Sequence, residues 1–153
     1  MIYCIGDSFT AGDELSDWSP KFNPQTEPYP ISQLAWPALL EKKTGIPVKN
    51  LGRGGSSNTR IVKRAMDATI DGADIVIVAW ATPLRIELFD DHGTFDVWQD
   101  RNIKVMAHVD TRGLLVKWIT THASKVDWYY AAWLRQIILL QAFFQANNQR
   151  YLM

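Results

Sequence analysis

The sequence predicts an α/β fold built on a parallel sheet, and three observations support that prediction. Short apolar segments alternate with helix-like segments over the first half of the chain, which is the pattern of β-loop-α units. Residues 73–80, ADIVIVAW, are almost continuously apolar and rich in β-branched side chains, as in a parallel strand buried on both faces. The length of 153 residues, with 47% hydrophobic residues, suits one domain with a substantial core.

The first half of the chain is expected to contain three strands and two helices. Strands are predicted at residues 2–5, 48–51 and 73–80, and right-handed crossovers would join them. A helix at residues 34–43 places Trp36, Leu39 and Leu40 on one face and ends before Gly45 and Pro47. A second helix at residues 57–70 carries an apolar stripe of Ile61, Ala65 and Ala68. Residues 13–30 hold four prolines and predict a long loop.

The second half of the chain does not continue the regular alternation of strands and helices. Residues 87–112 show no sustained period and predict an excursion of short irregular elements, with one helix expected at residues 114–122. A long helix is predicted at residues 128–145, where the spacing of Trp133, Ile137, Leu140 and Phe144 is typical of a core face or a subunit interface. Residues 150–153 resemble the opening of another strand. We therefore expect a domain that is C-terminally incomplete, with an unpaired sheet edge that favours a homo-oligomer.

Composition excludes several function classes. Lys+Arg and Asp+Glu both number 16, so no global basic field attracts nucleic acid or an anionic membrane surface. The single cysteine, Cys4, lies inside the first apolar segment and is expected to be a buried thiol. The sequence shows no signal peptide and no transmembrane segment, which makes a cytoplasmic location the default expectation.

Two glycine-rich loops follow the first two predicted strands. Residues 6–12, GDSFTAG, place Asp7 and Ser8 at a strand's carboxyl end, where open α/β sheets build their sites. Residues 50–57, NLGRGGSS, form the second loop. Either loop also has an ordinary structural interpretation, because Asp, Ser and Asn beside glycine are common turn and helix N-cap residues. In the second loop Ser56, Ser57 or Asn58 suits such a cap.

Together the two loops resemble the first two sequence blocks of the SGNH (GDSL-type) hydrolases, a superfamily of esterases and lipases. The resemblance implies that residues 1–153 form one flavodoxin-like domain, a three-layer α/β/α sandwich. It implies Ser8 as the nucleophile, with the backbone N–H groups of Ser8 and Gly55 as an oxyanion hole. Asp7 is expected to cap nearby N–H groups. The implied reaction is hydrolysis of a small-molecule or carbohydrate ester, such as carbohydrate O-deacetylation, without a metal or organic cofactor.

The chain departs from the family pattern in two places. The family's third block, Gly-x-Asn-Asp, supplies an asparagine as a further oxyanion donor, but this chain has ATPLR at residues 81–85, with Pro83 at the asparagine position. Asn58, Thr82 or Arg85 is a candidate substitute donor, although Arg85 and Glu87 also suit a solvated ion pair on a loop. The family's C-terminal Asp-x-x-His is absent, and none of the three histidines is assigned as the base.

Two other functions remain open on the sequence alone. One is an SGNH-like scaffold without catalysis that serves as a binding or structural module. The aromatic second half would then form a sugar-binding or subunit surface, from Trp98, Trp118, Trp128, Tyr129, Tyr130 and Trp133. The other is a phosphate or nucleotide cradle at the two glycine-rich turns. That alternative lacks the Gly-Lys-Ser/Thr signature of phosphate-binding loops.

Overall fold

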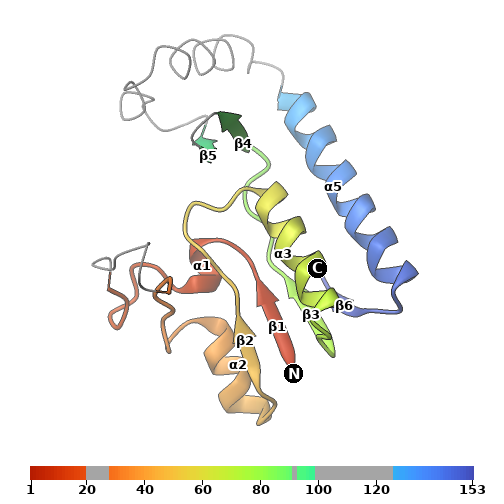
Figure 1. Cartoon of the computed structure of the whole chain (residues 1–153). Coiled ribbons are helices and arrows are strands. Elements are labelled where there is room, and N and C mark those ends of the chain that lie inside the picture. The colour runs from red at the N-terminus through yellow and green to blue at the C-terminus, as the bar shows by residue number, and fades with distance from the viewer. Residues whose placement is uncertain (20–27, 91–92, 99–125) are drawn as a thin grey trace.

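The computed structural model describes residues 1–19, 28–90, 93–98 and 126–153. Its centre is a four-stranded sheet in the order β2-β1-β3-β6 (Figure 1). All three pairings are parallel. The strands are β1 (Ile2–Ile5), β2 (Val48–Asn50), β3 (Ile75–Val78) and β6 (Arg150–Leu152). A parallel sheet with helices confirms the predicted α/β fold.

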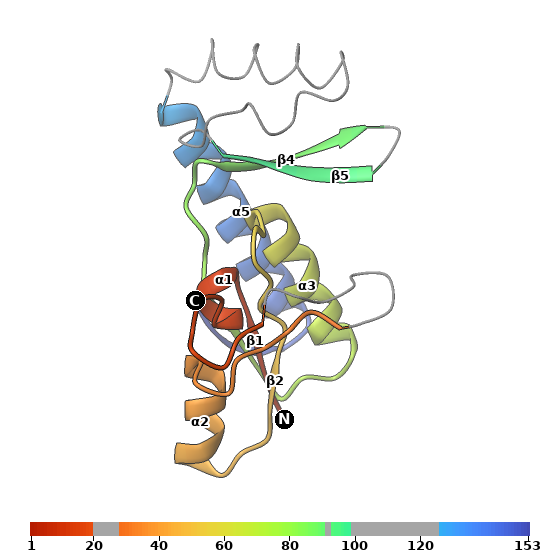
Figure 2. The same ribbon diagram turned by 90° about the vertical axis from the view of Figure 1, so that its left-hand side faces the viewer.

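Within the described ranges, four helices accompany the sheet: α1 (Ser8–Ala11), α2 (Trp36–Thr44), α3 (Asn58–Ile70) and α5 (Val126–Ala146). Figure 2 shows α2 and α3 on opposite sides of strands β1 and β2. Helix α5 packs along α3. The predicted boundaries of the three longer helices are right to within two residues at each end. The described parts of the predicted long loop, residues 13–19 and 28–30, contain neither helix nor strand.

The core lies where β1, β3, α3 and α5 meet. The predicted stripe on α3 is buried, and Leu140 and Phe144 of α5 are completely buried against it. The Phe144 ring lies 4.8 Å from that of Tyr151 on β6, which anchors the edge strand to the helix layer. The predicted apolar face of α2 is only partly covered, because Leu39 is 51% exposed. Gly45 ends α2 as expected, in the left-handed conformation with φ +69°.

The prediction of irregular structure from residue 87 onward is wrong for the described part of that segment. Strands β4 (Arg85–Asp90) and β5 (Gly93–Trp98) pair antiparallel as a hairpin, with Asp90 opposite Gly93. The hairpin lies beyond the carboxyl ends of the sheet strands (Figures 1 and 2). The strands carry a short alternation of period two, with Ile86 and Leu88 in register with Val97 and Phe95, but it covers only a few residues on each side of the turn, and the search for a sustained period missed it. The helix predicted at residues 114–122 lies outside the described residues.

The thiol of Cys4 is buried as predicted. The residue has no solvent exposure in the centre of β1, and burial raises the pKa of its thiol to about 12. Helix α5 keeps several large apolar side chains exposed, among them Tyr130, Leu134 and Ile138. Across the described ranges, no helix combines the length and apolar character needed to cross a membrane.

Candidate active site

Three loops meet at the carboxyl edge of the sheet. They follow β1, β2 and β3 and comprise residues 6–12, 51–57 and 79–85. The chain leaves β1 to form β2 on one side and then crosses over to form β3 on the other. Strand β1 therefore marks the point where the strand order reverses, and ligands of open α/β sheets bind in the crevice at such a point. We call residues 6–12 the nucleophile loop, after the sequence-based prediction for Ser8, residues 51–57 the glycine loop and residues 79–85 the third loop.

The nucleophile loop turns directly from β1 into α1. The Asp7 carboxylate accepts a hydrogen bond from the Phe9 N–H at 3.1 Å, so Asp7 is the helix N-cap, as predicted. Ser8 is half-buried. Neither its hydroxyl nor its N–H hydrogen-bonds to another residue in the part of the chain that the structure describes. The turn needs a glycine before Asp7, because a Cβ on Gly6 would overlap Thr10 Oγ1 and lie 3.1 Å from Ala79 O.

The glycine loop presents Gly55 on a tight turn. The turn is closed by the Ser56 N–H, which donates to Arg53 O at 3.2 Å. Gly55 has φ +76°, a conformation that favours glycine, and a Cβ at this position would meet nothing within 4 Å. The Arg53 N–H donates to Gly6 O at 3.2 Å and joins this loop to the nucleophile loop. Ser57, one of the three predicted caps, accepts from the Arg60 N–H and begins α3.

A carboxylate and a phenol that sequence reasoning missed lie beside the glycine loop. Tyr29 Oη donates to Asp13 Oδ2 at 2.6 Å, and the Arg53 guanidinium lies 5.7 Å from the centre of the Tyr29 ring. Burial, together with the Asp13 carboxylate, raises the pKa of Tyr29 to about 12. Burial also raises the pKa of Asp13. A Cβ on Gly54 would overlap both oxygens of the pair, so this glycine lets the loop pack closely.

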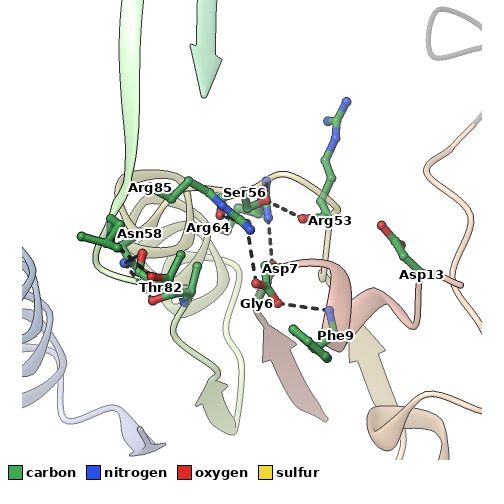
Figure 3. Close-up of polar contacts among 12 residues, drawn as sticks. Gly6, Asp7, Phe9, Asp13, Arg53, Ser56, Asn58, Arg64, Thr82 and Arg85 are labelled. Carbon is green, nitrogen blue, oxygen red and sulfur yellow. Dashed lines mark hydrogen bonds and ion pairs between the residues drawn. The ribbon is translucent and has the colours of Figure 1, made fainter. Parts of the chain in front are cut away.

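Arg85 is the main correction to the sequence-based interpretation of the third loop. The residue is only 5% exposed, so it is not part of a solvated ion pair. Its Nη1 donates to Ser56 O at 2.7 Å and lies 3.6 Å from Asp7 Oδ2 (Figure 3). The guanidinium therefore contacts both the nucleophile loop and the glycine loop. The expectation of a solvated residue failed because both partners are distant in the sequence.

Asn58, the first residue of α3, lies beside Thr82 of the third loop, and both are candidate donors (Figure 3). Asn58 is 3% exposed, and its Nδ2 donates to Ala81 O at 3.1 Å and to Thr82 O at 3.2 Å. Its Oδ1 accepts from the Ala81 N–H at 2.9 Å. The amide of Asn58 is thus engaged in holding the third loop. Thr82 is exposed, and its hydroxyl accepts from the Leu84 N–H at 3.4 Å.

Arg64 on α3 is a further cross-link that sequence reasoning missed. It donates to Ser56 Oγ at 2.9 Å and to two carbonyls, those of Leu51 at 3.3 Å and Gly6 at 3.5 Å. One feature of the sequence could have indicated this role: Arg64 borders the apolar stripe of the predicted helix, and that helix begins at the glycine loop. Ser56 itself is 1% exposed and donates its hydroxyl to Arg53 O at 2.7 Å.

Neither a histidine base nor a metal site can be assigned among the described residues. The three histidines, His92, His108 and His122, lie outside them. Among the described side chains, no group of three or more His, Cys, Asp or Glu residues is arranged to hold a metal ion. No family model matches the chain, and no curated protein matches it significantly.

Proposed function

We propose that this protein is an ester hydrolase of the SGNH type, with a flavodoxin-like α/β/α architecture and Ser8 as its nucleophile. Two observations together carry the proposal: the Ser8 hydroxyl has no partner among the described residues, and the turn at Gly55 is open. Both belong to loops joined by the bond from the Arg53 N–H to Gly6 O. The strand order β2-β1-β3, with the site beside β1, is also the order of flavodoxin-like sheets.

The proposed reaction is acyl transfer in two steps. Ser8 Oγ attacks the ester carbonyl carbon and forms a C–O bond while its proton passes to a general base. The N–H groups of Ser8 and Gly55 donate to the negative oxygen of the tetrahedral intermediate. Collapse of the intermediate breaks the ester C–O bond, the departing oxygen takes the proton from the base and leaves as the alcohol, and the acyl group stays on Ser8. Water then hydrolyses this acyl-enzyme, and the proposal assigns the base to none of the described residues.

The third loop lacks the family's asparagine donor, and this predicts a low kcat for ester hydrolysis. The family's asparagine donor is replaced by Pro83, which has no N–H, and the Asn58 amide is engaged by Ala81 and Thr82. Loss of one oxyanion-hole donor lowers kcat by about 100- to 1000-fold. We therefore expect a slow esterase that acts on activated or small acyl esters, including acetyl groups on carbohydrates.

The experiment compares hydrolysis of p-nitrophenyl acetate by the wild-type protein and Ser8→Ala. Ser16→Ala is the matched control, because Ser16 is an exposed serine of the following loop. We expect Ser8→Ala to abolish turnover above the rate in buffer and Ser16→Ala to retain the wild-type rate. Equal turnover in Ser8→Ala and wild type would overturn the proposal. The absence of turnover in the wild-type protein would also overturn it, in favour of a non-catalytic binding or structural module.

A further inference from the structure

A buried ion pair joins the three loops of the site, and the proposed reaction does not use it chemically. Arg85 begins β4 at the end of the third loop, with its side chain 3% exposed. Its Nη1 lies 3.6 Å from Asp7 Oδ2 in the nucleophile loop and 2.7 Å from Ser56 O in the glycine loop. Figure 3 shows the guanidinium between these two partners. One side chain thus spans the loops that carry Ser8 and Gly55.

The energetics of such a pair favour a role in geometry over a role in stability. Both side chains are less than a tenth exposed, so each charge loses most of its hydration on folding. The attraction between buried charges often only offsets that desolvation, and apolar replacements of similar volume can be neutral or stabilising. The N–H groups of a guanidinium point in fixed directions, so the bond from Nη1 to Ser56 O also fixes where the charge of Arg85 lies, 3.6 Å from Asp7 Oδ2. The arrangement therefore fixes where Asp7 and Ser56 lie relative to one another.

The two partners of Arg85 are direct neighbours of the proposed reacting groups. Asp7 precedes Ser8 and caps α1, which sets the direction of the first helical turn. Ser56 follows Gly55 and closes its turn through the bond from its N–H to Arg53 O. A shift of Arg85 would thus alter the separation of the Ser8 hydroxyl from the Gly55 N–H. Arg64 holds the same two loops from α3, through Ser56 Oγ and the Gly6 and Leu51 carbonyls.

We infer that Arg85 is a positioning residue that sets the separation of the nucleophile and the oxyanion hole by clamping Asp7 to the Ser56 carbonyl. This inference rests on the proposed function and extends it. The third loop then contributes to the site through a cation that holds the other two loops, in place of an asparagine that touches the substrate. Because misplacement of a reacting group by about 1 Å can cost 100-fold in rate, the clamp acts on kcat more than on KM.

The test measures kcat and KM for p-nitrophenyl acetate in Arg85→Met, with Lys63→Met as the matched control. Lys63 forms an exposed i,i+4 pair with Asp67 on the same helix that carries Arg64. We expect kcat to fall about 10- to 100-fold in Arg85→Met with KM within about twofold of wild type. Lys63→Met is expected to keep both constants. Arg85→Lys retains the charge without the planar fork, so its kcat should lie between those of Arg85→Met and wild type.

Hydrogen exchange separates this inference from the proposed function. Arg85→Met should speed amide exchange in residues 6–12 and 51–57 while exchange in β3 and α5 stays at the wild-type rate. Wild-type kcat together with wild-type exchange in Arg85→Met would overturn the inference even if Ser8 is the nucleophile. If the wild-type protein hydrolyses no ester, the proposed function fails, and faster exchange in these two loops would still support the clamp.

A second variant covers the case in which Arg85→Met does not fold because it leaves Asp7 buried without its cation. Asp7→Asn combined with Arg85→Met leaves no unpaired buried charge, and asparagine remains a good helix N-cap. We expect the double variant to fold and to show the same loss of kcat and the same faster exchange in the two loops. A folded double variant with wild-type kcat and wild-type exchange would overturn the inference.

Discussion

Asn58 offers the sharpest test of how the third loop is held. Its side chain makes three hydrogen bonds to the backbone of Ala81 and Thr82, with lengths of 2.9, 3.1 and 3.2 Å. In Asn58→Ala the Ala81 N–H keeps its buried position without an acceptor, which costs about 1 to 3 kcal/mol. The two carbonyl contacts add about 0.5 to 1.5 kcal/mol where water cannot replace the amide. The expected loss in the free energy of unfolding is roughly 2 to 4 kcal/mol.

The Asn58→Asp variant tests the same contacts through the pH dependence of stability. A carboxylate of the same shape keeps the bond from the Ala81 N–H, but it faces the carbonyl oxygens of Ala81 and Thr82 that the amide now contacts. Burial and these carbonyls raise the pKa of the introduced carboxyl above its unfolded value of about 3.9. The protonated form can donate to one carbonyl. The variant should therefore be close to wild type below about pH 4 and lose stability as the pH rises from there through the raised pKa.

The assay for both variants is urea unfolding followed by tryptophan fluorescence, at pH 7 for Asn58→Ala and at pH 4 and pH 7 for Asn58→Asp. The matched control is Asn147→Ala, because the Asn147 amide makes one exposed bond to Phe143 O at 2.8 Å. That control should stay within about 0.5 kcal/mol of wild type. If Asn58→Ala is no less stable than Asn147→Ala, the side chain does not hold the third loop. A pH-independent stability difference for Asn58→Asp would equally refute the reasoning.

Three further predictions concern the packing beneath the site. Gly52→Ala should cost about 3 kcal/mol, because its Cβ would overlap Ala11 N and lie 2.6 Å from the Thr10 carbonyl carbon. Gly45→Ala, with open space around its Cβ, should cost only about 1 to 2 kcal/mol, and equal costs in urea unfolding would contradict the close approach. Thr10→Val should raise the free energy of unfolding by about 1 to 2 kcal/mol, because Thr10 Oγ1 is buried without a hydrogen-bond partner, and a lower urea midpoint would refute this. The Cys4 thiol, with its pKa raised to about 12 by burial, should resist a disulfide reagent at pH 8 until urea unfolds the chain, and rapid reaction of the native protein would show that it is accessible.

Much of the fold could be predicted because its signals are local. The strand at residues 2–5, the α3 stripe and the Gly45 cap each follow from residues within one or two turns of one another. The β4–β5 hairpin was missed although its signal is also local, because the apolar alternation of Ile86 and Leu88 with Phe95 and Val97 is short and lies in a segment rich in Asp, Gly and His.

In the site too, contacts between residues close in the sequence were predictable and contacts between distant residues were not. The capping role of Asp7 was predictable because the N–H that donates to its carboxylate, that of Phe9, is two residues away. The bonds of Asn58 to Ala81 and of Arg85 to Ser56 span 23 and 29 residues, and the parallel strand order brings these partners together. No pattern within one loop indicates that Arg85 is buried or that it faces Asp7. Side chains that hold separate loops together are therefore the part of this site that only the three-dimensional arrangement identifies.

Covalent labelling with a fluorophosphonate, followed by peptide mass spectrometry, tests most directly whether Ser8 is an activated nucleophile. The reagent reports an activated serine without any assumption about the natural ester. We expect a stoichiometric adduct on the peptide that contains Ser8 and none on peptides that contain Ser32, Ser56 or Ser57, which are at most 1% exposed. Folded protein that takes up no label at Ser8, or that is labelled at another serine instead, would contradict this expectation.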